Sequence, residues 1–177
     1  YGRMTHPEEI IEKIKEQSKT SQLSGSRILI TAGPTREPID PVRFMSNYSS
    51  GKMGYAIAMA AKSKGASVEL ISGPVTLNPI TDIKTTYVET SSEMYEAVKE
   101  KVSDFDIFIS TAAIADYKPA NYSDIKYKKN KNNITIEFTR GIDILETISK
   151  KHKNLFTVGF AAETNSLKEN AQQKLAK

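Results

Sequence analysis

Apolar and polar positions follow two different spacings along this chain, and the order of these spacings predicts the fold. Short apolar runs typical of strands occur at residues 27–32, 67–72, 85–89, 106–111 and 156–161. Stretches with helical spacing lie at residues 52–64, 92–102, 143–152 and 167–177. The alternation predicts an α/β fold, a Rossmann-like, doubly wound and mostly parallel sheet with helices on both faces. Ser91 or Ser92 is the expected N-cap of the second helix.

Two segments depart from this alternation. Residues 125–129 and 134–139 alternate apolar and polar side chains with a period of two, on either side of Asn130-Lys-Asn-Asn133. This pattern is typical of a hairpin, so we expect an inserted lysine-rich β-hairpin. At the other end, residues 7–19 have an amphipathic helical pattern, and residues 20–26 have the composition of a linker.

The composition narrows the class of protein. The chain has 177 residues, of which 38% are hydrophobic and 26% charged, as expected for one domain with a short extension. No apolar run approaches the roughly 20 residues of a membrane helix, and no signal-peptide pattern is present, so we expect a cytoplasmic protein. The chain lacks cysteine, and His6 lies far from His152, which argues against a thiolate metal site or a serine–histidine triad.

The connection after the first strand is the most informative segment. Strand-to-helix connections normally have about 2–6 residues. This connection extends from Gly33 to about Ser50 and contains three prolines and two arginines. Free backbone N–H groups at the following helix start favour an anion, so the candidate phosphate-binding residues are Ser49, Ser50, Gly51 and Lys52. Alternatively, Ser49 or Ser50 only caps the helix.

Two further segments carry candidate chemistry. Small residues follow a strand at Ser110-Thr-Ala-Ala-Ile-Ala-Asp116, where a base or ribose could approach the backbone. Asp116 could bind a ribose hydroxyl or a hydrated metal ion, or it is simply a surface residue. The basic run Lys126-Tyr-Lys-Lys-Asn-Lys131 is most simply a solvated face. It could also bind single-stranded nucleic acid or act as a flap whose lysine reaches phosphate oxygens.

Two nucleotide-binding motifs are absent from the expected positions. Gly33 is not followed by the glycines of a dinucleotide fingerprint, and Ser46 stands where a P-loop would have its first glycine. A nicotinamide-dependent reductase on a Rossmann fold is therefore only an alternative, although Tyr95 and Lys99 have the spacing of a Tyr-x-x-x-Lys pair. A non-catalytic RNA-binding module is another alternative, and it leaves the long loop unexplained.

Several motifs in order resemble one family. The stretch Ala32-Gly-Pro-Thr-Arg-Glu-Pro-Ile-Asp-Pro-Val-Arg-Phe-Met-Ser-Asn-Tyr-Ser-Ser-Gly-Lys-Met-Gly54 is similar to the signature of bacterial phosphopantothenoylcysteine synthetase. So are residues 112–117, Lys126-Tyr-Lys-Lys129 and Val158-Gly-Phe-Ala-Ala-Glu-Thr164. Residues 1–10 resemble the tail of a phosphopantothenoylcysteine decarboxylase domain. The resemblance implies a decarboxylase tail and linker at 1–25 and a ligase domain at 26–177 that is C-terminally truncated relative to the family.

The resemblance also implies an activity and its partners. It implies CTP-dependent ligation of 4′-phosphopantothenate with L-cysteine in coenzyme A biosynthesis, through an acyl-cytidylate. The products are 4′-phosphopantothenoylcysteine, CMP and pyrophosphate. Mg²⁺ is the implied cofactor. A homodimer and an upstream decarboxylase domain are implied, and no nucleic acid or membrane partner is expected.

Site residues follow from the same resemblance. The implied catalytic residues are Asn47, Arg43 and Lys126. The implied nucleotide site is formed by Ser110, Thr111, Ala112, Asp116, Lys126, Ile142, Asp143, Ile144, Leu145, Phe160 and Lys174. The motif Arg140-Gly-Ile-Asp-Ile144 departs from the Lys-x-Pro-Asp-Ile that is usual in the family.

Overall fold

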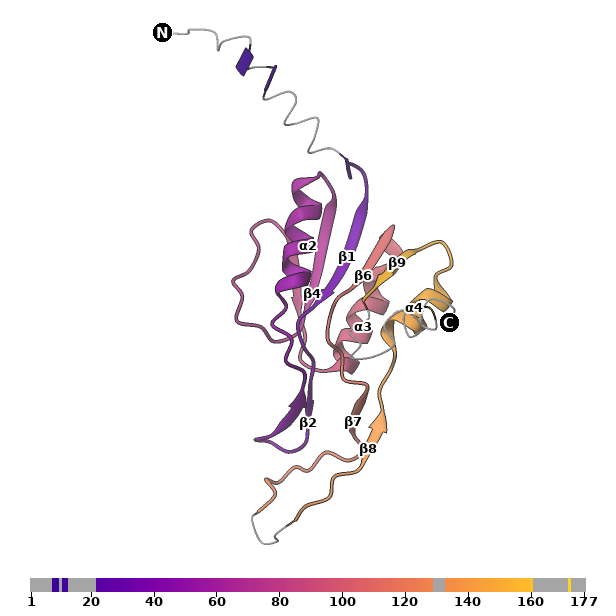
Figure 1. Ribbon diagram of the computed structural model, residues 1–177. Helices are drawn as coiled ribbons and strands as arrows, with labels where there is room; N and C mark the ends of the chain where they lie inside the picture. The colour runs from indigo at the N-terminus through magenta and orange to yellow at the C-terminus, as the bar shows by residue number, and fades with distance from the viewer. Residues whose placement is uncertain (1–7, 10, 13–21, 129–132, 161–171, 173–177) are drawn as a thin grey trace.

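Five parallel strands form the central sheet (Figure 1). The computed structural model describes residues 8–9, 11–12, 22–128, 133–160 and 172. The sheet consists of β1 (Arg27–Ala32), β4 (Ser67–Ser72), β5 (Lys84–Tyr87), β6 (Ile107–Ser110) and β9 (Phe156–Gly159). Their order is β5-β4-β1-β6-β9, and each neighbouring pair is parallel. The chain starts in the middle of the sheet and winds outward in both directions, which confirms the predicted doubly wound fold.

Helices cover both faces of this sheet. Helix α2 (Lys52–Ser63) packs on one face, where Ile30 of β1 is fully buried. Helices α3 (Ser91–Lys101) and α4 (Ile144–Lys151) pack on the opposite face, over Leu29 of the same strand. Successive side chains of a strand point to opposite faces, so β1 contributes to both cores. The short 3₁₀ helix η1 (Val102–Asp104) follows α3.

The lysine-rich segment lies in an arm (residues 117–128 and 133–140) whose strands coincide with the predicted ones only at residues 138–139. In the arm, β7 (Tyr117–Pro119) pairs antiparallel with β8 (Phe138–Arg140). Residues 125–128 and 133–137 are not strands, and residues 129–132 lie outside the described residues. Ile125 is 73% exposed. Outside residues 138–139 the period-two pattern was misleading, since apolar side chains such as Ile125 and Ile134 are exposed and pack on no core.

A second antiparallel pair lies within the long connection after β1. It consists of β2 (Arg36–Pro38) and β3 (Phe44–Ser46). In the turn between them, the Asp40 carboxylate accepts hydrogen bonds from the N–H groups of Val42 and Arg43, both at 2.9 Å. An aspartate that binds backbone groups two or three residues later is a common way to form a turn. The sequence prediction treated this segment as a loop because each strand has only three residues.

Helix α3 begins one residue earlier than predicted. Thr90 is its N-cap: the Thr90 hydroxyl accepts from the Glu93 N–H at 3.1 Å, and the Glu93 carboxylate accepts from the Thr90 N–H at 3.3 Å. The expectation that Ser91 or Ser92 caps the helix is therefore wrong. Ser91 is instead buried, and its N–H donates to the buried Glu37 carboxylate at 2.9 Å. This contact ties β2 to the start of α3.

Replacing Thr90 with alanine should lower the free energy of unfolding by about 1 kcal/mol, because the Glu93 N–H loses its acceptor. Thermal or urea denaturation measures the loss. Ser92→Ala is the matched control, since Ser92 is exposed and its hydroxyl only accepts a bond from the Lys118 ammonium. An equal loss in both variants would contradict the assignment of the cap.

The two terminal helices of the prediction fall mostly outside the described residues. In the expected helix at residues 7–19, residues 8–9 and 11–12 are described, and they are helical. In the expected helix at residues 167–177, only residue 172 is described. Within the described part of the chain, no helix has the length and apolar character needed to cross a membrane.

Candidate functional site

The loops that leave β1 and β6 meet directly beyond the carboxyl ends of these strands. The Ala113 N–H donates to the Gly33 carbonyl at 2.9 Å, and the Thr35 N–H donates to the Ala113 carbonyl at 3.2 Å. The Asn47 side-chain amide donates to the same Ala113 carbonyl at 3.0 Å. Asn47 is exposed. The loop at residues 33–50 and the loop at residues 110–116 therefore form one surface. Asn47 is held on this surface and is exposed to solvent.

The start of α2 lies against the same edge, and glycine is required for this close approach. Gly33 and Gly51 both have φ near +77°. A Cβ atom would lie 2.8 Å from Val75 Cγ1 if added at Gly33, and 2.7 Å from the same atom if added at Gly51. The glycines therefore allow the loop after β1 and the start of α2 to pack closely around the Val75 side chain.

Gly51 itself is the N-cap of α2, and no side chain caps this helix. The alternative that Ser49 or Ser50 caps α2 is wrong; the Ser49 hydroxyl accepts only a long bond, 3.4 Å, from the Gly51 N–H. The first N–H groups of α2 have no acceptor within the helix. Ser50 and Lys52 are exposed beside them. This arrangement suits an anion, and phosphate binding by residues 49–52 stays a prediction.

Most predicted nucleotide-binding residues gather at the neighbouring part of this edge. Ser110, Thr111 and Ala112 end β6 or follow it directly. The base of the arm lies next to them, because the Gly141 N–H donates to the Asp116 carbonyl at 2.7 Å. The Asp116 side chain is exposed. Residues 142–145 follow Gly141 and lead into α4, so they reach the same edge as the β6 loop.

Individual members of this group differ in how accessible they are. Ile144 is 1% exposed and belongs to the core below α3 and α4. Asp143 is the N-cap of α4, and its carboxylate accepts from the Glu146 N–H at 2.9 Å. Phe160 follows β9 and is 49% exposed. Lys174 lies outside the described residues. Ile142 and Phe160 are therefore better placed than Ile144 to contact a ligand with their side chains.

Arg43 is exposed, but its guanidinium is bound by other residues of the protein. Its Nε atom donates to the Asp40 carboxylate at 2.9 Å, and Nη2 binds the same carboxylate oxygen. Nη2 also donates to the Tyr127 carbonyl at 3.0 Å, and the guanidinium lies 5.7 Å from the centre of the Tyr127 ring. Lys126, next to Tyr127, is exposed and has no hydrogen bond or ion pair with the described residues. All three residues predicted to be catalytic are exposed; Arg43 differs from Lys126 in that its guanidinium already binds Asp40 and Tyr127.

Asp40 was missed in the sequence analysis. Its side chain is 0% exposed, although it is ionisable. The hydrogen bonds from the Arg43 guanidinium hold the pKa of the Asp40 carboxyl well below its usual range, against the opposing effect of burial. The available signal was the pattern Asp-Pro-x-Arg, in which an arginine stands three residues after an aspartate.

Asp40 should make stability depend on pH in acid. A carboxyl group whose pKa is lowered by folding stabilises the protein above its unfolded pKa of about 3.9, and this contribution is lost as pH falls toward the folded pKa. Asp40→Asn should therefore reduce the slope of unfolding free energy against pH below about pH 5. Urea denaturation at a series of pH values measures this slope. An unchanged slope in the variant would contradict the role given to this ion pair.

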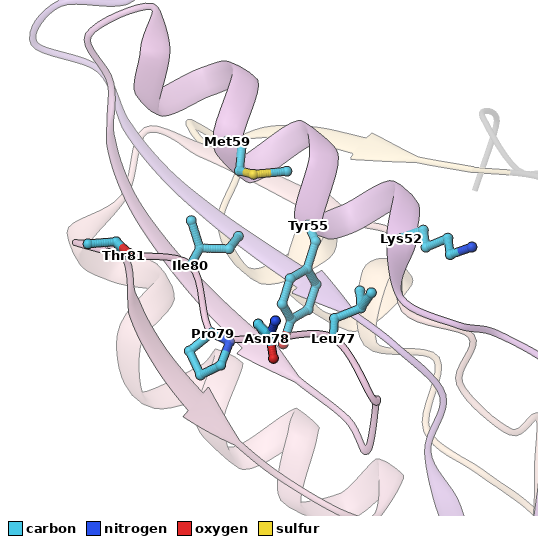
Figure 2. Close-up of a pocket in the computed structure, with 8 residues that line it drawn as sticks. All are labelled: Lys52, Tyr55, Met59, Leu77, Asn78, Pro79, Ile80 and Thr81. Carbon is cyan, nitrogen blue, oxygen red and sulfur yellow. The ribbon is translucent and has the colours of Figure 1, made fainter.

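A groove of about 530 Å³ lies beside α2 (Figure 2). It is formed by α2 and the β4–β5 connection, and its lining residues are Lys52, Tyr55, Met59, Leu77, Asn78, Pro79, Ile80 and Thr81. Among the predicted site residues only Lys52 lines this groove, and in Figure 2 its side chain extends away from the others. Of the candidate residues, therefore, only Lys52 is common to the groove and the carboxyl edge.

Comparisons with known proteins place this arrangement in a family. Residues 23–177 match the model of the DNA/pantothenate metabolism flavoprotein C-terminal domain. The chain is 47% identical over 179 residues to the coenzyme A biosynthesis bifunctional protein CoaBC of Vibrio vulnificus; the match covers 99% of this chain and 45% of that protein. The chain thus spans less than half the length of this curated relative.

Two solved structures extend the comparison. The C-terminal domain of a coenzyme A biosynthesis bifunctional protein CoaBC matches with a TM-score of 0.79 and 48% identity, over 88% of this chain and 74% of that domain. A Cab2 mutant, H337A, in complex with phosphopantothenate-cysteine matches with a TM-score of 0.73 over 99% of this chain and 77% of that protein. At 16% identity the second match supports the fold alone.

Proposed function

The chain belongs to the family of the DNA/pantothenate metabolism flavoprotein C-terminal domain, and from this premise we propose that it is the phosphopantothenate–cysteine ligase part of a bifunctional enzyme of coenzyme A biosynthesis. The proposed reaction is CTP-dependent. The carboxylate of 4′-phosphopantothenate attacks the α-phosphate of CTP, and pyrophosphate leaves. The cysteine amine then attacks the acyl carbon of the acyl-cytidylate, and CMP leaves.

The proposed first step requires positive charge and N–H donors around the phosphates. The uncapped N–H groups at the start of α2 supply donors at the carboxyl edge, and exposed Lys52 and Lys126 supply charge. Mg²⁺ commonly binds through one or two carboxylates together with substrate phosphates, and the exposed Asp116 carboxylate at this edge fits that role. The described residues offer no group of three acidic or histidine side chains that would hold a metal unaided. When bound, Mg²⁺ supplies charge that offsets repulsion between phosphates.

The proposed second step requires a donor for the oxyanion that forms at the acyl carbon. Asn47 suits this role because an amide nitrogen carries two N–H donors. One of them is used by the Ala113 carbonyl, which fixes the orientation of the side chain and leaves the other for the ligand. This contact between Asn47 and the β6 loop is the single observation that best supports the proposed mechanism.

Further parts of the proposal extend beyond the described site. We also propose that residues 1–25 are an upstream tail with its linker and that residues 26–177 are the ligase domain. The family match begins near this boundary, at residue 23. A homodimer, an upstream decarboxylase domain and a cytoplasmic location also remain predictions. The bifunctional relatives support the upstream domain.

Calorimetric titration of the chain with CTP, ATP and NADPH, each with Mg²⁺, tests the nucleotide proposal. We expect CTP to bind more tightly than ATP and NADPH not to bind. Lys126→Ala should weaken CTP binding, whereas Lys153→Ala, an exposed lysine after α4, is the matched control and should not. Binding of NADPH alone would support the reductase alternative and contradict the ligase proposal. In a separate titration, RNA binding that is strongly salt-dependent and equally tight for different sequences would instead support the RNA-binding alternative.

A further inference from the structure

We propose that Asp40 is a positioning residue that fixes the backbone of the lysine arm and thereby places Lys126 for the reaction. This inference rests on the proposed ligase function for its chemical consequence, and on contacts in the structure for its physical basis. We use the name arm clasp for the group formed by Asp40, Arg43 and Tyr127.

Asp40 is the centre of the arm clasp. Its buried carboxylate accepts five hydrogen bonds: one oxygen binds the N–H groups of Val42 and Arg43, and the other binds two guanidinium nitrogens of Arg43 and the Tyr127 N–H, the last at 3.1 Å. A carboxylate saturated with donors in this way stays ionised although it is removed from solvent. Asp40 thus joins the turn after β2 to a residue 87 positions later in the chain.

Both backbone polar groups of Tyr127 form hydrogen bonds within the arm clasp. Its N–H donates to Asp40, and its carbonyl accepts from Arg43 at 3.0 Å. A second contact fastens the arm nearby, because the Ser123 N–H donates to the Ile39 carbonyl at 3.1 Å. The arm therefore attaches to residues 39–43 at two points. Figure 1 shows β2 and the arm beyond the same end of the sheet.

The consequence for Lys126 follows from its place in the chain. It directly precedes Tyr127, so the arm clasp limits where its Cα atom can lie. Its side chain remains exposed, without a bond to the described residues, so its ammonium is available for a ligand. The same turn leads through β3 to Asn47. The arm clasp therefore links the segment that carries Lys126 to the segment that carries Asn47.

The arm clasp is not part of the hydrophobic cores. Neither core cluster includes Asp40, Arg43 or Tyr127. Loss of the clasp should consequently release the arm and leave the five-stranded sheet folded. This separation allows a positioning role to be distinguished from a general effect on folding.

Hydrogen exchange of the arm tests the physical part of the proposal without any assay of activity. Asp40→Asn keeps the size of the side chain but places an amide against the Arg43 guanidinium and the Tyr127 N–H. We expect the Tyr127 amide to exchange about 10-fold faster or more, because a bond to a charged acceptor is lost. Amides of β1 should exchange at the original rate. Unchanged exchange at Tyr127 would overturn the proposal.

A double-mutant cycle tests the chemical part. Asp40→Asn should lower kcat about 10-fold or more, and it should have almost no further effect when Lys126→Ala is already present. If the losses in kcat of the two single variants add fully in the double variant, Asp40 does not act through Lys126. This holds whether or not the exchange of the Tyr127 amide changes. Asp124→Asn is the matched control on the same arm; Asp124 is exposed, and we expect neither exchange at Tyr127 nor kcat to change.

The outcomes also separate this inference from the proposed function. If the original chain forms no pyrophosphate from CTP and phosphopantothenate, the ligase proposal and the chemical part of this inference both fail. Faster exchange at Tyr127 in Asp40→Asn would still support the arm clasp in that case. If the original chain is active and exchange is unchanged, the arm clasp is wrong and the ligase proposal stands.

Discussion

Replacing Asn47 with alanine is expected to slow the conversion of the acyl-cytidylate by about 10²–10³-fold, so that this intermediate accumulates. Removal of one preorganised donor to a developing oxyanion typically has an effect of this size. The Asn47 amide is oriented by the Ala113 carbonyl, and no reorganisation is needed when the oxyanion forms. Formation of the intermediate should change much less, because the first step places its charge on phosphate oxygens.

A quenched reaction with labelled CTP measures this effect. Separation of the quenched products gives the amounts of acyl-cytidylate and CMP over time. Tyr48→Ala is a suitable control, since Tyr48 is the next residue, is fully exposed and has no place in the proposed mechanism. Normal turnover in Asn47→Ala, or slow turnover without an accumulated intermediate, would show that Asn47 does not act in the second step.

Replacing Gly73 with alanine is expected to lower the free energy of unfolding by at least about 1–3 kcal/mol. The added Cβ would collide with the Pro34 carbonyl oxygen, which belongs to the backbone and cannot rotate away. Gly73 follows β4, and its N–H donates to the Ala32 carbonyl at 2.9 Å. The collision would therefore push the loop after β1, which carries the candidate residue Asn47, away from the end of β4.

Gly159→Ala is the matched control for this prediction. The nearest atom to a Cβ at Gly159 is Cδ2 of Leu145, the end of a flexible side chain that can change rotamer. Thermal denaturation compares the two variants, and each kcal/mol corresponds to roughly 2–4 °C for a domain of this size. A smaller loss for Gly73→Ala than for Gly159→Ala would mean that the backbone contact at Pro34 is not as close as described.

The central sheet could be predicted because its strands are buried on both faces. Apolar runs such as 27–32 and 106–111 have few alternatives to a buried strand, and helical stretches between them indicate parallel pairing. The least apolar strand was also predicted least well: residues 85–89 were expected, and β5 spans Lys84–Tyr87. The buried strand β1 was thus predicted with its correct bounds, whereas the bounds of the more exposed β5 were shifted.

The antiparallel pairs could not be predicted reliably, because local alternation does not identify a partner. Residues 125–128 have the pattern of a strand, yet the Tyr127 N–H binds the Asp40 carboxylate. The cap of α3 was uncertain for a similar reason. Three consecutive residues, Thr90-Ser-Ser92, are all good N-caps, and tertiary contacts selected Thr90 when Ser91 was buried beside Glu37.

The sequence predicted which loops lie together at the candidate site, but not the individual contacts that their side chains make. Loops that follow neighbouring parallel strands meet at one edge, so the contact of Asn47 with the β6 loop could be anticipated. The internal role of Arg43 could not, because it depends on Tyr127, which lies 84 positions away. Contacts between distant segments of this kind require the folded structure.

Release of pyrophosphate from CTP is the measurement that tests the central claim most directly. The chain is incubated with CTP, Mg²⁺ and 4′-phosphopantothenate, with and without L-cysteine, and pyrophosphate and CMP are measured separately. The ligase proposal predicts pyrophosphate only when phosphopantothenate is present, and release of CMP with formation of the cysteine product only when cysteine is added. Absence of pyrophosphate from the complete mixture, or its release without phosphopantothenate, would contradict the proposal.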